Sequence, residues 1–515
     1  MIGFWSIAKE NPDHLALVAP DGREILAAEL LASSNRVVHG LRALGLRRGD
    51  TIAMLMKNAP EMIELFLAAQ QAGWYITPIN SHLVGPEVAY ILQDSGAKAF
   101  FADARCTKAA QAAAREVNLP AETRFALGAI DGFRPYAAVK EGQPGTTPED
   151  RKAGAAMTYT SGTTGRPKGV RRPLADMGPD EMAMNHAGFL MLFGIMPGEP
   201  GVHLVGSPLY HTAVLNFCMN HLHLGHTVVL MEKWEAEESL RLIEKYGVTN
   251  SHMVPTQFAR LLNLPEATRE KYDLSSLRHM IHSAAPCPVD VKRKMLAWWG
   301  PVIYEYYAAS EGGGTLATPQ DWLRYPGTVG NPWPISEVKI LDDDGNALAP
   351  GEVGTVYMRM GGIEFEYHKD KDKTSKAWRD GFFTVGDAGY LNEDGFLFLR
   401  DRKTDMIISG GVNIYPAEIE SQLIGHPKIA DVAVFGIPNE DWGEEVKAVV
   451  EPAEGVVADE ALRAELAAWC QENVAGYKRP RTIDFMAELP RDPNGKLYKR
   501  RLRERYWEGH DSLIG

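Results

Sequence analysis

The distribution of apolar residues up to residue 307 alternates between two patterns. Short apolar runs of strand length are followed by longer segments in which apolar residues recur every three or four positions. The runs predict strands at 51–56, 74–79, 98–102, 203–207, 226–231, 250–254, 277–282 and 302–307, and the periodic segments predict helices at 60–73, 85–95, 214–224, 235–246, 255–262 and 289–299. Strands that alternate with crossover helices form largely parallel sheets, so the pattern predicts an α/β fold.

The pattern changes from residue 327 onwards. Short apolar runs are there separated by turns rich in Gly, Asp and Pro, for example at 341–346. This spacing predicts a small β-rich subdomain over about 327–400. A chain of 515 residues is too long for one ordinary hydrophobic core, so two or more domains are expected.

One segment combines the residue types that bind a phosphate group. Residues 159–170 read Tyr-Thr-Ser-Gly-Thr-Thr-Gly-Arg-Pro-Lys-Gly-Val. Glycines let backbone N–H groups approach an anion, hydroxyls donate hydrogen bonds, and the lysine adds a positive charge. The expected contacts are Thr160, Ser161, Gly162, Thr163, Thr164, Gly165 and Lys168. Pro167 stands where the common P-loop has a glycine, and it argues against a helix directly after the loop. An ordinary exposed turn is the alternative interpretation.

The run from Thr160 to Gly169 resembles the signature loop of the adenylate-forming superfamily, which includes acyl-CoA synthetases, luciferases and the adenylation domains of peptide synthetases. The resemblance implies a large N-terminal domain of mostly parallel sheets flanked by helices, and a small mobile α+β C-terminal domain. The family hinge falls at Thr404, where relatives usually carry Asp or Lys, so the expected domains are 1–403 and 404–515. The resemblance also implies that ATP and Mg²⁺ are used to adenylate a carboxylic acid.

Two further segments resemble the nucleotide-binding motifs of this family. Residues 306–311, Tyr-Tyr-Ala-Ala-Ser-Glu, are similar to the pattern Tyr-Gly-x-Thr-Glu, with an alanine in place of the glycine. The resemblance places Tyr306, Tyr307 and Ala308 at the adenine, Ser310 at the phosphates, and Glu311 with Thr163 at Mg²⁺, an ion that carboxylates suit. Residues 385–387, Val-Gly-Asp, resemble the family's Thr-Gly-Asp. Asp387 would accept hydrogen bonds from both ribose hydroxyls, with Arg402 beside it.

The acid is expected near Ser283-Ala-Ala-Pro286, which follows a predicted strand. In the family this stretch lines the adenine and acyl pockets, and a tight strand-to-helix turn is the alternative. The expected nucleotide contacts are Ala284, Ala285 and Pro286, and the expected acyl or CoA contacts are His211, Val214, His282, Ser283, Gly312, Gly313, Gly410 and Gly411. His282 and Ser283 replace the family's usual Ser and Gly. The triple glycine 312–314 either leaves room for a bulky acid or lets the backbone turn.

The segment 489–496, Leu-Pro-Arg-Asp-Pro-Asn-Gly-Lys, resembles the family's catalytic lysine loop. Lys496 would bridge the acid and the α-phosphate during adenylation, a charge delivered only in the closed state. The domain would then turn and bring Gly410 and Gly411 against the pantetheine arm. The expected catalytic set is Lys496, Glu311, His211 and Thr164. A lysine in a basic tail is the plain alternative, and acetylation of Lys496 is a further hypothesis.

These features predict an ATP-dependent acid–CoA ligase (acyl-CoA synthetase) acting through an acyl-adenylate. No Lys or Arg lines the expected acyl pocket, which favours a hydrophobic monocarboxylic acid: fatty, aryl or polycyclic. Two alternatives remain: an adenylating enzyme that loads a separate carrier protein, and a nucleotide-binding regulator without turnover. The ending Gly509-His-Asp-Ser-Leu513 mimics a carrier-domain serine motif, but too few residues follow it to build a carrier domain.

Composition narrows the partners and the location. The net charge of −13 argues against a general nucleic-acid binder. Four scattered cysteines fit a reducing cytosol, and no apolar run is long enough to span a membrane or to resemble a signal peptide, so a cytoplasmic protein is expected. His221, His223 and His226 suggest a metal site, but their spacing favours core or surface histidines. The sequence leaves the oligomeric state open, a homodimer being one option.

Overall fold

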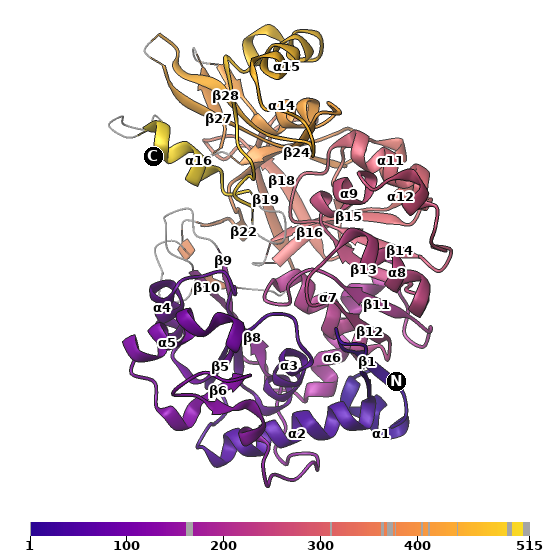
Figure 1. Ribbon diagram of the computed structural model, residues 1–515, viewed down its shortest axis with the longest axis vertical. Coiled ribbons are helices and arrows are strands. Elements are labelled where there is room, and N and C mark those ends of the chain that lie inside the picture. The colour runs from indigo at the N-terminus through magenta and orange to yellow at the C-terminus, as the bar shows by residue number, and fades with distance from the viewer. Residues whose placement is uncertain are drawn as a thin grey trace. The chain divides into compact units, whose positions relative to one another are not determined.

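The computed structural model describes residues 2–160, 168–309, 312–361, 365–367, 374–375, 377–402, 405–409, 412–439, 441–491 and 497–507 (Figure 1). The chain divides into two compact units. The first consists of Met1–His252, Leu264–Ile281 and Ile363–Lys376, and the second of Met253–Asn263, His282–Gly362 and Ala377–Gly515. The expected boundary between 403 and 404 stays a prediction.

A six-stranded parallel sheet forms one half of the first unit. Its order is β7 (Arg134–Pro135), β6 (Arg124–Leu127), β5 (Ala97–Asp103), β3 (Thr51–Leu55), β4 (Tyr75–Pro78) and β8 (Ala155–Ala156). The accompanying helices are α2 (Ala27–Ala43), α3 (Pro60–Ala72), α4 (Gly85–Ser95) and α5 (Thr107–Glu116). Every residue of the central strand β3 is buried, which explains its continuous apolar sequence.

The other half of the first unit is a second sheet. The strands β12 (Thr227–Leu230), β11 (Val202–Val205) and β13 (Asn250–Met253) run parallel, and β1 (Leu15–Val18) pairs in parallel with β12 and antiparallel with β2 (Glu24–Leu26). The helices of this half are α1 (Phe4–Glu10), α6 (Pro179–Met191), α7 (Thr212–His223), α8 (Ala236–Tyr246) and the short α10 (Glu266–Arg269). The alternation of strands and helices predicted from the sequence is therefore confirmed.

The second unit begins with the elements expected to carry the acid site. These are α9 (Pro255–Leu262), the last residue of β14 (His279–His282), α11 (Val289–Trp299), β15 (Ile303–Ala309), β16 (Gly312–Ala317), α12 (Pro319–Arg324) and β17 (Asn331–Pro332). Strands β15, β16 and β17 pair antiparallel. Antiparallel pairing therefore begins at β15, before the change of texture that the sequence shows from residue 327.

Two strand-rich regions complete the second unit. The first is an antiparallel sheet of β21 (Trp378–Arg379), β22 (Phe382–Phe383), β19 (Gly354–Met360), β23 (Asp387–Leu391) and β24 (Leu397–Arg402), with β18 (Ser336–Leu341) paired to β19. It confirms the strand-rich region predicted from residue 327. The second contains β25 (Ile407–Ser409), β26 (Val412–Ile414), β27 (Ile429–Asn439), β28 (Gly443–Pro452) and β29 (Thr482–Phe485), with α14 (Pro416–Leu423), α15 (Glu460–Asn473) and α16 (Lys499–Trp507) (Figure 1). It is the expected small α+β C-terminal domain.

Candidate active site

The predicted phosphate loop joins two strands of a hairpin. Strands β9 (Thr158–Thr160) and β10 (Lys168–Arg171) pair antiparallel, with Thr160 opposite Lys168. A strand rather than a helix follows the loop, as Pro167 predicts. Ser161, Gly162, Thr163, Thr164 and Gly165 lie outside the described residues, and only the backbone of Thr160 and Lys168 is described. Their phosphate contacts stay predictions.

The expected adenine and ribose residues come together in the second unit. The hydroxyl of Tyr307, on β15, donates a hydrogen bond of 2.6 Å to Oδ2 of Asp387 at the start of β23. Asp387 in turn lies directly opposite Arg402 in the pairing of β23 with β24. The tyrosine hydroxyl and the carboxylate therefore meet, and of Arg402 only the backbone, opposite Asp387, is described. Ser310 and Glu311 lie outside the described residues.

The turn after β14 has an unusual backbone. Ala284 has a φ of 73°, in the left-handed region that costs a residue with a Cβ atom about 1–2 kcal/mol. Ala284 and Pro286 are exposed, Ala285 is half-buried, and Ser283 is buried. Ser283 hydrogen-bonds to the phenol of Tyr306. Burial raises the pKa of Tyr306 to about 12, and this hydrogen bond opposes the rise. Backbone strain of this kind often occurs at ligand sites, and the position of the acid at this turn stays a prediction.

At the third glycine of the run 312–314, Gly314, neighbouring atoms pack closely and leave no open space. A Cβ atom on Gly314 would lie 2.5 Å from the carbonyl oxygen of Tyr307 and 2.6 Å from the indole of Trp333. Gly312 and Gly313 have φ values of 132° and 71°, which side chains rarely adopt. Of the two interpretations, room for a bulky acid or a turn of the backbone, the structure supports the backbone turn at Gly312 and Gly313. The space beside Gly314 is filled by Trp333.

His282 lies in the interior and not on an open pocket wall. Its side chain has no exposed surface, and its Nε2 lies 3.4 Å from Oε2 of Glu305. The same oxygen accepts a hydrogen bond of 2.7 Å from Nζ of Lys292. Neither Lys292 nor Glu305 was expected at the site. A signal existed, because Lys292 falls on the helical stripe with Met295, Leu296 and Trp299, where apolar residues are the rule.

His211 and Val214 lie in the first unit. His211 immediately precedes α7, and its ring centroid is 4.3 Å from that of Tyr210. Val214 is buried in the first turn of the helix and belongs to the hydrophobic core. A role in the acyl or thiol site stays a prediction for both residues.

A group of buried histidines surrounds α7. The rings of His203 and His221 stack with centroids 4.0 Å apart, and Nδ1 of His221 lies 2.8 Å from Nδ1 of His226. His226 contacts the carbonyl oxygen of Glu199 through Nε2, at 3.0 Å, so its Nδ1 is the acceptor and His221 the donor when both rings are neutral. His223 accepts a hydrogen bond from the backbone N–H of Phe4. The part of the chain that the structure describes contains no group of three or more His, Cys, Asp or Glu residues able to hold a metal ion.

The C-terminal domain presents a hairpin and an exposed aromatic residue next to each other. Ser409 of β25 pairs with Val412 of β26, so Gly410 and Gly411, which lie outside the described residues, connect the two strands. Strands β25 and β26 thus form a hairpin. Ser409 also pairs with Gly443, beside Trp442, whose ring is 47% exposed and lies 5.3 Å below the guanidinium of Arg481. Sequence patterns did not reveal this aromatic–cation pair.

The segment that carries Lys496 is anchored at both ends. Lys496 itself lies outside the described residues. Arg491 pairs with Leu497 across an isolated bridge and forms an ion pair with Asp431, with Nη2 2.7 Å from Oδ1. The backbone N–H of Leu489 donates a hydrogen bond of 2.8 Å to Glu451. The ends of the lysine loop are therefore fixed to the sheet of the C-terminal domain.

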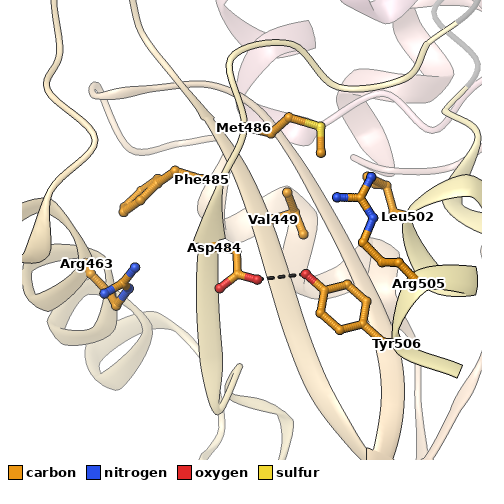
Figure 2. Close-up of a pocket in the computed structure, with 8 residues that line it drawn as sticks. All are labelled: Val449, Arg463, Asp484, Phe485, Met486, Leu502, Arg505 and Tyr506. Atoms are coloured by element: carbon orange, nitrogen blue, oxygen red, sulfur yellow. Dashed lines mark hydrogen bonds between the residues drawn. The ribbon is translucent and has the colours of Figure 1, made fainter. Parts of the chain in front are cut away.

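A separate pocket of about 340 Å³ lies between α15, β29 and α16 (Figure 2). Tyr506 donates a hydrogen bond of 2.7 Å to Asp484, and Lys447 forms an ion pair with the same carboxylate at 2.8 Å. Arg463 donates to the carbonyl oxygen of Ile483. These polar groups bind one another within the C-terminal domain. None of the predicted site residues lines this pocket.

The two units define an α/β protein in which Tyr307 and Asp387, both expected at the nucleotide, contact each other. Residues 4–368 match the AMP-binding enzyme family, and residues 418–496 match the AMP-binding enzyme C-terminal domain. The chain therefore belongs to the family of AMP-binding enzymes, which confirms the resemblance seen in the sequence.

Individual relatives extend over nearly the whole chain. The fatty acid–[acyl-carrier-protein] ligase ScoC of Streptomyces coeruleorubidus is 32% identical over 97% of this chain and 95% of its own length. Feruloyl-CoA synthase of an Amycolatopsis species is 33% identical over 98% of this chain and 99% of its own length. ATP-bound MatB from Rhodopseudomonas palustris superposes with a TM-score of 0.83 at 30% identity, covering 99% of this chain and 100% of that one. The α/β fold class is thus confirmed.

Proposed function

We propose that the protein is an ATP-dependent carboxylic acid–CoA ligase that acts through an acyl-adenylate on a hydrophobic monocarboxylic acid. The observation that carries the proposal is the contact of Tyr307 with Asp387, opposite the backbone of Arg402, in a chain that belongs to the AMP-binding enzymes. Two vicinal ribose hydroxyls are donors and an ionised carboxylate offers two acceptors, so Asp387 suits a ribose directly. The tyrosine ring beside it suits an adenine face.

The first step joins the acid to the nucleotide. A carboxylate oxygen of the acid attacks the α-phosphorus of ATP, the bond to the bridging oxygen breaks, and pyrophosphate leaves with that electron pair. The loop that contains Lys168 would hold the leaving pyrophosphate, and Lys496 would stabilise the charge at the α-phosphate. Mg²⁺, with Glu311 and Thr163 as expected ligands, would neutralise phosphate charge. These residues are proposed from the family motif alone.

The second step transfers the acyl group to a thiol. The sulfur attacks the acyl carbonyl carbon, the carbon–oxygen bond to the phosphate breaks, and AMP leaves. Trp442 and Arg481 beside the hairpin 407–414 favour free CoA as the thiol. An exposed indole can stack on an adenine and a guanidinium can bind a phosphate, and CoA carries both groups. The arm of a carrier protein carries no adenine.

The carrier-protein alternative has a specific observation in its favour, because ScoC is named as a ligase for acyl-carrier protein. Purified protein, ATP and a panel of fatty, aryl and polycyclic acids decide between the two. We expect pyrophosphate release with one class of acid and formation of its CoA thioester when CoA is added. Pyrophosphate release without a thioester, together with acylation of an added carrier protein, would favour the alternative.

The assignment of the two steps to different residues has its own test. Lys496→Ala is expected to abolish pyrophosphate exchange and yet convert a supplied acyl-adenylate to the thioester, because the lysine serves only the first step. Loss of both half-reactions in a folded variant would contradict this division. AMP formation that is absent with every acid in the panel would instead support a regulator without turnover.

A further inference from the structure

A lysine is buried in the core beside the turn expected to hold the acid. Lys292 has no exposed side-chain surface and lies on the inward stripe of α11. Its Nζ is 2.7 Å from Oε2 of Glu305 and 5.0 Å from the ring centroid of Trp322. A fully buried lysine is rare, and here it is paired both with a carboxylate and with an aromatic face.

The same carboxylate oxygen also contacts a third group. Nε2 of His282 lies 3.4 Å from Oε2 of Glu305, and the His282 ring meets Phe258 edge-on at 5.2 Å. Burial raises the pKa of Glu305, and Lys292 opposes that rise. One oxygen atom thus links α11, β15 and the last residue of β14. Lys292, Glu305 and His282 are named the carboxylate network below.

Stability alone does not account for the carboxylate network. Taking two charges out of water carries a large desolvation penalty, and apolar residues of similar volume often replace a buried ion pair with no loss of stability. What an ion pair adds is geometric definition, because its partners must keep distance and direction. The network therefore suits a place where the position of the backbone matters.

Its members stand next to the residues expected to contact ligand. His282 is followed directly by Ser283 and by Ala284, whose backbone is in the left-handed region. Glu305 precedes Tyr306 in β15, and Tyr306 hydrogen-bonds to Ser283. A strained backbone persists only where its surroundings hold it. The network thus joins the residue before this turn, His282, to the strand β15 that carries Tyr306.

We propose that the carboxylate network is a positioning device that fixes the turn 283–285 and thereby sets which acid the enzyme accepts. Lys292 and Glu305 act through His282 and the strand β15, without touching the acid. The inference rests on the proposed function for the identity of the ligand. The claim that the network orders the turn can be tested without any enzymatic activity.

The decisive variant removes the whole pair and keeps the core apolar. In Lys292→Met/Glu305→Leu no charge is left unpaired, so the melting temperature is expected to equal or exceed that of the wild type. The control is Lys140→Met/Glu64→Leu with Tyr136→Phe, which removes a largely buried Lys–Glu pair (Nζ to Oε2 3.0 Å) in the first unit together with the tyrosine hydroxyl that donates to Glu64. Glu305→Gln, which keeps the side-chain shape, is the second variant if the double replacement does not fold.

Two measurements are made on each protein. Hydrogen exchange read by mass spectrometry gives the protection of residues 283–285. Pyrophosphate release gives the ratio of kcat/KM between the best acid of the panel and the acid shorter by two methylene groups. In the site variants we expect exchange at the turn to rise and the acid ratio to fall, each by about tenfold, since a small displacement of a positioning element has large kinetic effects. The control is expected to match the wild type in both.

Every outcome bears on the proposal. If residues 283–285 exchange hydrogen as slowly in the site variants as in the wild type, the pair is purely structural and the proposal is overturned. Faster exchange with an unchanged acid ratio overturns the claim of acid selection, and an equal fall of the ratio in the control overturns the assignment to this network. A wild-type protein that releases no pyrophosphate with any acid refutes the proposed function instead, and hydrogen exchange then judges the positioning role alone.

Discussion

The buried histidines around α7 predict that the first unit loses stability steeply in mild acid. Burial lowers the pKa of His223 and of His252 to about 3, with a further lowering of the first by His186. Burial also lowers the pKa of His226 to about 4, with Glu199 opposing and His14 and His279 adding smaller contributions.

The sign follows from proton binding in the two states. Unfolded histidines bind protons below the ordinary pKa of about 6.5, whereas the folded ones stay neutral until about 4 or 3. The unfolded chain therefore binds more protons, and the free energy of unfolding falls as the pH drops through the window from about 6.5 to about 4. His223 shows the physical cause, because protonation of its Nδ1 would remove the acceptor for the N–H of Phe4.

The magnitude can be worked out for a drop to about pH 5. Each of these three histidines then destabilises the folded state by about 2 kcal/mol, because the unfolded ring is almost fully protonated and the folded ring is not. If they titrate independently the sum is about 6 kcal/mol, comparable to the whole stability of an ordinary domain. Burial also raises the pKa of Glu61 in the same unit, so the folded carboxyl takes up its proton above its ordinary pKa and opposes part of this loss there.

Urea unfolding followed by pulse-labelling hydrogen exchange and mass spectrometry measures this unit by itself, on peptides from residues 2–160 and 168–252. We expect a slope of about three protons or more taken up per molecule unfolded between about pH 6 and pH 5, because burial also lowers the pKa of His203 and of His221 in this unit. His223→Gln should lower the slope by one proton, and His82→Gln, at an exposed position, should leave it unchanged. A free energy of unfolding that stays flat over this window, or a slope that His223→Gln does not change, would refute the reasoning.

Three further predictions concern the second unit. Ala284→Gly should raise the free energy of unfolding by about 1 kcal/mol because it relieves the left-handed backbone, whereas Ala285→Gly should lower it, as urea titration can show. Trp442→Ala should raise the KM for CoA about tenfold and leave both the KM for pantetheine and the rate of pyrophosphate release unchanged; equal losses with both thiols would contradict adenine stacking. Gly314→Ala should destabilise by about 1–3 kcal/mol, since its methyl group would meet Trp333 and backbone, and an unchanged melting temperature would show that the strand can shift.

Much of the fold was predictable because it depends on local pattern. The helices α4, α9 and α11 begin and end where the apolar periodicity places them, and α8 ends before Gly247 in the left-handed conformation. The hairpin of β1 and β2 was not predicted, although Asp21-Gly22 between two apolar runs is a strong turn signal. The short strand β6 was also missed, because its four residues carry too little periodicity to stand out.

The site was predictable only in part. Asp387 and Arg402 were expected at one ribose from the family motif, and the strand register brings their backbones opposite each other. The contact of Tyr307 with Asp387 joins residues 80 positions apart, and the contact of Lys292 with Glu305 joins a helix to a strand. No local pattern encodes such contacts, because they depend on which strands become neighbours.

The sequence by itself determined the α/β class, the glycine- and threonine-rich loop before Lys168 and the family, since periodicity and short motifs are written in neighbouring residues. Only the tertiary structure decided that His282 turns inward to Glu305, that Trp333 occupies the space left by Gly314, and that Ala284 takes a left-handed backbone. The physical reason is that burial and backbone strain are properties of packed elements: a side chain's surroundings are set by residues far along the chain.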